Sequence, residues 1–368
     1  CKPIGKGNVV KVRVDLGPRS YDILIKAGLL DQLATWLKEY GLNAPKGMLV
    51  TDDRVDPLHT YGLQKRLVEQ GLVYPRSVVP SGEESKSKDW LFQIYSDALE
   101  AGLDRKSVLI AVGGGVVGDL GGYAAASYLR GIRYVQVPTT LLSMVDSAVG
   151  GKTGINLPQG KNLIGAFHQP SLVLCDLGTL NTLPACEFRS GLAEIIKYGI
   201  IYDPVLFDFC ETHMNAALAS DPLVLEHLVS RSCMIKAEVV TQDETESGLR
   251  AILNFGHTLG HAIEAVAGYG KFLHGEAISI GMVYAARLSV KLTGLTSEEA
   301  DRIERLFVQA QLPVKAGGLS WSALRKAMEV DKKSTGGSPR FVLARSIGSV
   351  EAGIPVDDAL LKSVWESM

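Results

Sequence analysis

Cysteine is scarce in this sequence and shows no pairing pattern. Among 368 residues there are five cysteines, an odd number that includes no Cys-x-x-Cys pair. This usage argues against a disulfide framework and is typical of reduced thiols in a cytoplasmic protein. We therefore expect buried, unpaired thiols at Cys1, Cys175, Cys186, Cys210 and Cys233.

Long hydrophobic runs and blocks of like charge are also missing. The most apolar stretch, VLIAVGGGVVGDLGGYAAAS, contains Asp119 and six glycines, which argues against a membrane span. The formal net charge is -2, so we expect neither nucleic acid nor an anionic membrane as a partner. A content of 46% hydrophobic and 21% charged residues is ordinary for a globular protein. The length suggests about two domains.

Two catalytic motifs are present only in part. Gly151-Lys152-Thr153 resembles the end of a phosphate-binding P-loop, but the first glycine of that motif would fall at Asp146. An ATPase is therefore rejected. The segment HTLGH at residues 257–261 lacks the glutamate of the HExxH motif, which argues against a metalloprotease.

Strand-like and helix-like patterns alternate through the first half of the chain. Alternating segments at residues 9–15 and 21–25 predict a hairpin near a sheet edge. The patterns that follow predict a parallel sheet with helices on both faces. The expected strands are 47–53, 107–112, 133–137 and 172–175, and the expected helices are 29–40, 63–70 and 90–101.

After Pro184 the pattern changes to long amphipathic helices, followed by a short strand at 341–343. We therefore predict two domains. Residues 1–180 form an N-terminal α/β, Rossmann-like, nucleotide-binding domain, and residues 181–368 form a mainly α-helical metal- and substrate-binding domain. The helices expected in the second domain are 187–200, 204–219, 222–241, 253–266, 276–292 and 297–309.

A glycine-rich turn follows the expected strand at 107–112. In Gly113–Asp119 the sequence GGGVVGD lies between that strand and a helix, where backbone amides can approach a diphosphate. A tight turn without a ligand is the alternative. The acid expected about 20 residues downstream for a ribose is absent, and Asp52 precedes the turn instead.

Residues 146–162 combine glycines, small side chains and two lysines, Lys152 and Lys161. Few acids lie nearby to neutralise the lysines. The segment is interpreted either as a solvated loop or as a cradle for a phosphate or another oxyanion.

Three histidines suggest a metal site in the second domain. His257 and His261 are four residues apart and share one helix face, and His274 follows a Gly-Tyr-Gly break. The apolar helix around residues 191–199 adds Glu194 and Lys197, three apart on one face. An internal ion pair is one interpretation. The other is that Glu194 joins the histidines as a zinc ligand and Lys197 reaches the substrate.

Further basic residues are scattered through the second domain, at Lys236, Arg250, Lys332 and Lys333. Each could simply be solvated at the surface. Their number beside a metal site favours an anionic substrate that carries phosphate or carboxylate.

Several long blocks resemble the 3-dehydroquinate synthases, which belong to the sugar-phosphate cyclase superfamily. They are GGGVVGDLGGYAAASYLRGI, VPTTLLSMVDSAVGGKTGINLPQGKNLIGAFHQP, AEIIKYG, NFGHTLGHAIEA and LHGEA. Similarity is continuous from about residue 107 to 276 and weaker toward both ends, where SGEESK and DKK also match.

The resemblance implies roles for individual residues. It implies a divalent metal, zinc or cobalt, on Glu194, His257 and His274, and catalytic roles for His261, Lys197, Lys152 and Glu246. Arg130 matches an arginine that reaches the phosphate across a homodimer interface. The implied NAD-binding residues are Asp52, Ser81, Gly82, Glu83, Glu84, Ser85, Lys86, Gly115, Val116, Val117, Gly118, Asp119, Thr139, Thr140, Lys152, Lys161, Thr179, Leu180, Asn181 and Thr182. The implied substrate-binding residues are Arg130, Asp146, Lys152, Asn162, Lys197, Lys236, Arg250, Asn254, His261 and one of Lys332 and Lys333.

The implied reaction converts 3-deoxy-D-arabino-heptulosonate 7-phosphate to 3-dehydroquinate and phosphate, a step of the shikimate pathway. Three alternatives stay open. One is another sugar-phosphate cyclase, a 2-deoxy-scyllo-inosose or 2-epi-5-epi-valiolone synthase. The others are a metal-dependent polyol dehydrogenase and a non-catalytic NAD-binding protein.

Overall fold

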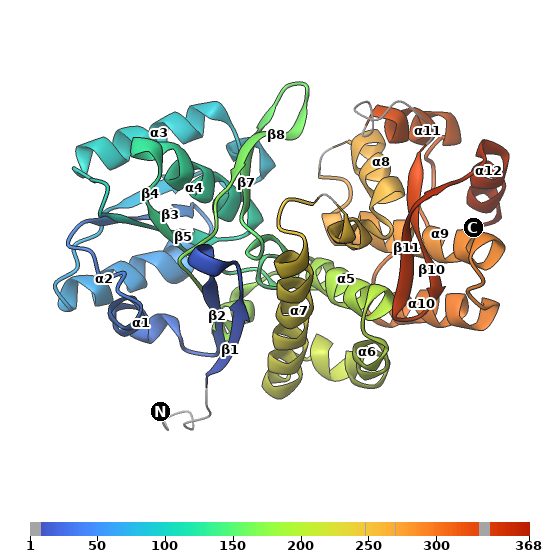
Figure 1. The fold of residues 1–368 in the computed structure, drawn as a ribbon, viewed down its shortest axis with the longest axis horizontal. Coiled ribbons are helices and arrows are strands. Elements are labelled where there is room, and N and C mark those ends of the chain that lie inside the picture. Colours follow the sequence, from blue (N-terminus) through green and yellow to red (C-terminus); the bar gives the residue numbers. More distant parts are fainter. Residues whose placement is uncertain (1–8, 247, 269, 331–338) are drawn as a thin grey trace. The chain divides into compact units, whose positions relative to one another are not determined.

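The computed structural model describes residues 9–246, 248–268, 270–330 and 339–368. The chain forms two compact units (Figure 1). The α/β unit comprises Cys1–Leu183 with Lys236–Thr241, and the helical unit comprises Pro184–Ile235 with Gln242–Met368. Lys332 and Lys333 lie outside the described residues.

A seven-stranded sheet forms the centre of the α/β unit, in the order β1-β2-β9-β6-β5-β3-β4. The β1–β2 pair is antiparallel and lies at an edge, which confirms the predicted hairpin. All other neighbours in the sheet are parallel. The strands are β1 (Val10–Val14), β2 (Tyr21–Lys26), β3 (Gly47–Asp52), β4 (Arg76–Val79), β5 (Val108–Gly113), β6 (Arg133–Pro138) and β9 (Leu172–Asp176).

Helices cover both faces of this sheet (Figure 1). Every residue of β5 is buried, as is usual for a central parallel strand. Ile110 packs in the cluster with α1 and α2, while Leu109 packs in the cluster with α3 and α4. The helices are α1 (Leu33–Glu39), α2 (Tyr61–Glu69), α3 (Lys88–Glu100) and α4 (Gly115–Ser127). The predicted α/β architecture is confirmed.

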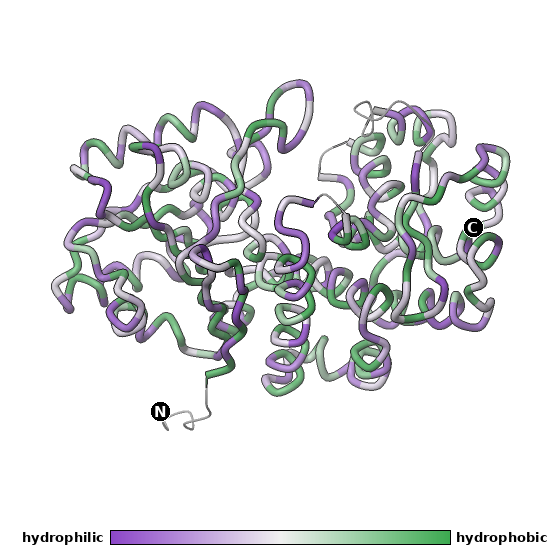
Figure 2. The backbone as a smooth tube through the Cα atoms, in the orientation of Figure 1, coloured by the Kyte–Doolittle hydropathy of each residue, from purple (hydrophilic) through white to green (hydrophobic). Residues whose placement is uncertain are grey.

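A second, two-stranded sheet occupies much of the segment 146–162, which was interpreted from the sequence either as a solvated loop or as a cradle for an oxyanion. Antiparallel strands β7 (Lys152–Leu157) and β8 (Gly160–Phe167) form a hairpin. Its tip is hydrophilic and the residues that follow in β8 are mainly hydrophobic (Figure 2). Gly154 and Gly165 face each other across the ladder, and a Cβ at Gly165 would lie 2.1 Å from the Thr153 carbonyl oxygen. The glycines that suggested a loop therefore permit close strand pairing.

The helical unit contains the expected long helices and three elements that were not predicted. The expected helices are α5 (Ala185–Ile201), α6 (Pro204–Leu218), α7 (Pro222–Gln242), α8 (His257–Ala267), α9 (His274–Leu292) and α10 (Ser297–Gln309). The strand predicted at 341–343 is β10 (Arg340–Ser346). The unpredicted elements are α11 (Trp321–Val330), β11 (Ser349–Pro355) and α12 (Asp358–Ser367).

The predicted helix 253–266 begins later than expected. Leu249–Asn254 is a separate 3-10 turn, and Gly256 has a φ of +77° before α8 begins at His257. A left-handed residue interrupts a right-handed helix, so His257 becomes the first residue of its helix.

Cysteine burial follows the prediction at three of the four described positions. Cys175, Cys210 and Cys233 are buried, and none of the four described cysteines forms a disulfide with another. The prediction is wrong for Cys186, which is exposed because it lies in the first turn of α5, before the buried part of that helix. Cys1 lies outside the described residues.

Among the described residues, no helix has the length and apolar character needed to cross a bilayer.

Close packing of α8 against α9 depends on glycine. A Cβ at Gly281 would lie 2.0 Å from the Gly256 carbonyl oxygen, and backbone cannot yield as a flexible side chain does. We predict that Gly281→Ala destabilises the protein by about 3 kcal/mol, the upper range for overpacking. The matched control is Gly317→Ala in the same unit, where nothing lies within 4 Å of the added Cβ. Denaturant unfolding of the two variants measures this, and equal midpoints would contradict the prediction.

Candidate active site

Three histidines converge where α8 and α9 begin. His257 is the first residue of α8, His261 lies one turn later, and His274 is the first residue of α9. The ring centroid of His257 lies 5.4 Å from that of His261 and 5.4 Å from that of His274, and the His261 and His274 centroids are 6.1 Å apart. The two helices thus aim their rings at a common point.

Helix α5 adds a carboxylate to this group. Glu194 is fully buried, and its Oε1 lies 3.3 Å from His257 Nε2 and 3.5 Å from His274 Nε2. Lys197 Nζ forms an ion pair with Oε2, yet neither oxygen accepts a well-directed hydrogen bond from the described residues. Donor atoms of Glu194, His257 and His274 lie within 4.8 Å of one another. A buried carboxylate flanked by two imidazole nitrogens fits a divalent metal ion.

The protonation of these groups follows from their surroundings. Burial raises the pKa of Glu194, but Lys197 and the histidines outweigh it and hold that pKa well below its usual value. Burial, together with the Lys197 charge, lowers the pKa of His257 to about 4. Burial also lowers the pKa of His274, but Glu194 and Glu264 reverse this and raise it to about 9. A metal ion must displace the His274 proton when it binds.

Backbone and side-chain contacts orient both histidines. His257 Nδ1 donates to the Phe255 carbonyl oxygen at 3.0 Å, which leaves Nε2 directed toward Glu194. His274 Nδ1 lies 3.3 Å from Glu264 Oε2. Glu264 was not identified from the sequence. Its spacing could have indicated it, because Glu264 follows His261 by three residues and both therefore lie on the same helix face.

The other predicted substrate residues of the helical unit lie near the start of α8. Arg250 is buried and donates from Nη1 to the Glu244 carbonyl oxygen at 2.7 Å, while its Nε finds no acceptor among the described residues. Asn254 is exposed, and its Nδ2 lies 3.4 Å from Glu246 Oε1. Glu246 itself has a φ of +61°.

In the α/β unit, most of the predicted NAD residues follow the carboxyl ends of neighbouring parallel strands. Asp52 ends β3, Ser81–Lys86 follows β4, Gly115–Asp119 follows β5, and Thr139 and Thr140 follow β6. Thr179, Leu180, Asn181 and Thr182 follow β9 in the turn Leu177–Thr182. Since these five strands are parallel, the segments lie along one edge of the sheet, where nucleotides bind in open α/β sheets.

Lys86 links two of these segments to the β7–β8 hairpin. Its buried ammonium forms an ion pair with Asp119 and a hydrogen bond with the Asn162 side chain. Burial raises the pKa of Asp119, although Lys86 opposes the shift. Asn156 N donates to the Lys86 carbonyl oxygen at 2.8 Å, and Asn156 Nδ2 donates to Glu83 Oε1 at 2.8 Å. The segment Ser81–Lys86, helix α4 at Asp119 and the β7–β8 hairpin are therefore joined.

A second buried lysine in the α/β unit pairs with Asp146. Lys236 Nζ lies 2.6 Å from Asp146 Oδ1 and 2.5 Å from the Asp146 carbonyl oxygen. Both are predicted substrate-binding residues. Lys236 comes from the end of α7, in the short segment that joins the α/β unit.

Three other predicted cationic residues are exposed. Lys152 and Lys161 are exposed on the hairpin, and Arg130 is exposed with a φ of +68°. The Asp52 carboxylate accepts from Arg54 N and Val55 N, each at 2.9 Å. Thr182 Oγ1 lies 2.8 Å from His59 Nε2, a contact that was not predicted.

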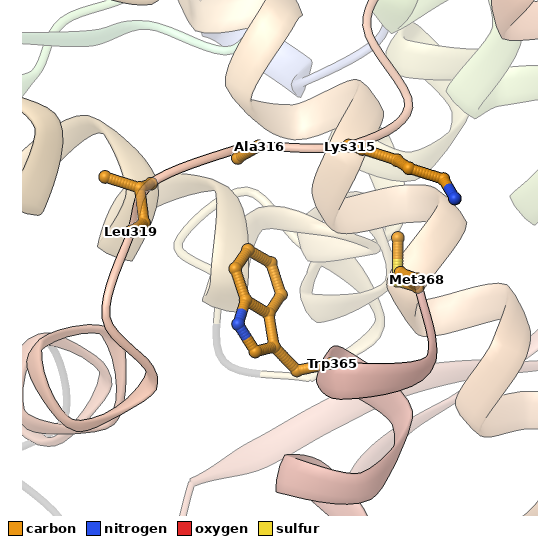
Figure 3. Close-up of a pocket in the computed structure, with 5 residues that line it drawn as sticks. All are labelled: Lys315, Ala316, Leu319, Trp365 and Met368. Atoms are coloured by element: carbon orange, nitrogen blue, oxygen red, sulfur yellow. The ribbon is translucent and has the colours of Figure 1, made fainter.

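A small cavity of about 120 Å³ lies elsewhere in the helical unit (Figure 3). Lys315, Ala316, Leu319, Trp365 and Met368 line it. None of them is a predicted site residue, so the cavity is separate from the residue groups described above.

The fold and the residue groups define a class. An N-terminal Rossmann-like nucleotide-binding domain precedes a mainly helical domain that carries a Glu-His-His metal-binding group. The family model described as 3-dehydroquinate synthase N-terminal matches residues 76–190, and the one described as 3-dehydroquinate synthase C-terminal matches residues 191–334. The chain belongs to the 3-dehydroquinate synthase family, which confirms the resemblance seen in the sequence.

Individual relatives agree with this assignment. A 3-dehydroquinate synthase of Nitrosomonas europaea is 49% identical over 354 residues, which cover 96% of this chain and 95% of the relative. One of Acidithiobacillus ferrooxidans is 52% identical over 336 residues, 91% of this chain and 92% of the relative. A structure of 2-epi-5-epi-valiolone synthase from Streptomyces hygroscopicus subsp. jinggangensis, with NAD+ and Zn2+ bound, has a TM-score of 0.86 at 29% identity and covers 94% of this chain and 96% of that one.

Removing the buried carboxylate tests the metal group. We predict that Glu194→Gln weakens zinc binding by more than about 100-fold. Loss of a residue that only hydrogen-bonds to a metal ligand lowers metal affinity by about 10- to 100-fold, and loss of a ligand itself should lower it further. The change also leaves Lys197 buried without its counter-ion, which should cost about 3 kcal/mol of stability. The double variant Glu194→Gln/Lys197→Met should recover stability but not zinc affinity. Chelator competition and unfolding measure the two effects, and zinc affinity unchanged in the single variant would contradict the site.

Proposed function

We propose that this chain is a 3-dehydroquinate synthase, a lyase that forms 3-dehydroquinate and phosphate from 3-deoxy-D-arabino-heptulosonate 7-phosphate. The observation that carries the proposal is its similarity, at 46% to 52% identity over more than nine-tenths of the chain, to enzymes of that name. The reaction comprises transient oxidation, β-elimination of phosphate, reduction, ring opening and an intramolecular aldol step.

The cofactors in this proposal are NAD and one divalent ion, zinc or cobalt. The Glu194, His257 and His274 group fits the ion because its buried carboxylate otherwise lacks directed hydrogen bonds from the described residues. When bound, the ion would supply a Lewis acid for a substrate hydroxyl, and NAD would supply an acceptor for a hydride. The segments at the carboxyl edge of the sheet support NAD binding, with the first turn of α4 favouring the diphosphate.

Buried cations suit the anionic substrate. Arg250 offers an Nε that finds no acceptor among the described residues, and a carboxylate or phosphate oxygen would satisfy it. Lys197 and Lys236 are already held by Glu194 and Asp146, so their ammonium groups are fixed before substrate arrives. Fixed positive charge stabilises the departing phosphate without reorganisation.

The remaining assignments extend the proposal to the assembly. Arg130 is exposed at a corner where Leu129 and Arg130 both have positive φ, which suits a side chain that reaches a second copy of the chain. We propose a homodimer on this basis and on the resemblance. The reduced state of the four described cysteines supports a cytoplasmic location.

His261 is the side chain proposed for proton relay, since it lies beside both His257 and His274 and is not a member of the Glu194, His257 and His274 group. We predict that His261→Ala lowers turnover by about 100-fold or more, the usual effect of losing a general acid-base group. Zinc content should stay intact. His227→Ala, at an exposed histidine of α7, serves as the control with unchanged turnover. Loss of zinc from His261→Ala would make His261 a ligand and end the assignment.

A phosphate-release assay tests the function as a whole. With NAD and zinc, the protein should release phosphate from 3-deoxy-D-arabino-heptulosonate 7-phosphate without net formation of NADH. Chelator, or removal of NAD, should stop the release. Activity on glucose 6-phosphate or sedoheptulose 7-phosphate alone would instead indicate one of the other cyclases. Net NADH would indicate a polyol dehydrogenase.

A further inference from the structure

The two ring nitrogens of His274 face two different carboxylates. Nε2 lies 3.5 Å from Glu194 Oε1 on α5, and Nδ1 lies 3.3 Å from Glu264 Oε2 on α8. Glu264 follows His257 by seven residues and His261 by three, so all three side chains project from one face of α8. Glu264 thus reaches the start of α9 from the side opposite Glu194.

His257 shows the effect of a hydrogen bond on the ring nitrogen that points away from Glu194. Its Nδ1 donates to the Phe255 carbonyl oxygen, so the neutral ring carries its proton on Nδ1 and its lone pair on Nε2. For His257 the acceptor is backbone, which no side-chain substitution removes. For His274 the corresponding acceptor is a side chain and can be changed.

We propose that Glu264 is a positioning residue for His274. It accepts the Nδ1 proton and thereby holds the His274 lone pair on Nε2, toward Glu194 and His257. The inference rests on the metal site in the proposed function. Outer carboxylates of this kind fix ring orientation and raise the basicity of a ligating histidine.

A competing donor set makes the proposal specific. Donor atoms of His261, Glu264 and His274 also lie within 4.8 Å of one another, and this set would use Glu264 as a ligand. A neutral imidazole offers one lone pair, so His274 cannot serve both sets at once. All three members of the competing set are half-buried, whereas Glu194 is fully buried. The buried carboxylate has the greater need of a cation, which favours the set that contains Glu194.

The experiment compares zinc affinities by chelator competition, without substrate or NAD. Glu264→Ala should bind zinc about 10- to 100-fold more weakly than the wild type. Glu264→Gln should lose less, because its amide oxygen can still accept the Nδ1 proton. Glu298→Ala, at an exposed position on α10, is the matched control and should bind as the wild type does. Wild-type affinity in Glu264→Ala would overturn the proposal.

Two further variants separate the possible outcomes. His261→Ala should keep wild-type zinc affinity; a fall equal to that of Glu264→Ala would show that the competing set holds the ion and would overturn the proposal. Glu264→Leu replaces Glu264→Ala if the alanine variant fails to fold, and the same loss of affinity is expected. A wild-type protein that binds no zinc would contradict the proposed function as well, whereas zinc binding that ignores Glu264 would contradict only this inference.

Discussion

A carboxylate without solvent contact is the constraint on which the helical unit depends. Every residue of α5 from Ser190 to Ile201 is buried, so Glu194 has no route to water. Burying an ionised carboxylate costs several kcal/mol unless positive charge and hydrogen bonds surround it. Lys197 supplies one charge from the same helix, and α8 and α9 supply the imidazoles. The arrangement of three helices is thus tied to the neutralisation of one side chain.

Glycines beside these residues let the helices come close enough. Gly275 follows His274, and a Cβ there would lie 2.2 Å from the Ser190 carbonyl oxygen of α5. Gly275 N also donates to Ser190 Oγ at 2.8 Å. Gly256 precedes His257 and meets the backbone of α9 at Met282 and Gly281. Both histidines of the proposed metal group therefore lie next to a point of backbone contact, which restricts the positions of their Cα atoms.

Local pattern was enough to predict nine helices and six of the seven strands of the large sheet, because burial on one or two faces of an element leaves a periodic pattern of hydrophobic residues in the sequence. The strand β4 was not among the expected strands. Prediction from local pattern failed where an element or a role depends on a residue that is distant in the sequence. The β7–β8 hairpin depends on Gly154 facing Gly165, and glycine by itself suggests a loop. Glu264 can orient His274 only because α9 begins beside α8, although the two residues are ten apart in the sequence. The roles of Glu194 and Lys197 stayed open because an internal ion pair and a metal ligand leave the same trace in the sequence.

Each unit holds buried site lysines in ion pairs with carboxylates. Lys86 pairs with Asp119 and Lys236 with Asp146 in the α/β unit, and Lys197 pairs with Glu194 in the helical unit. A buried pair adds little net stability, since the desolvation of both charges offsets their attraction. The pair instead fixes the positions of both side chains, because neither can turn away without leaving the other charge buried and unpaired. In the proposed function, a divalent ion held by Glu194 would take over the neutralisation of that carboxylate, which would leave the Lys197 ammonium available to another anion. Metal binding would in this way prepare the charge that an anionic substrate requires.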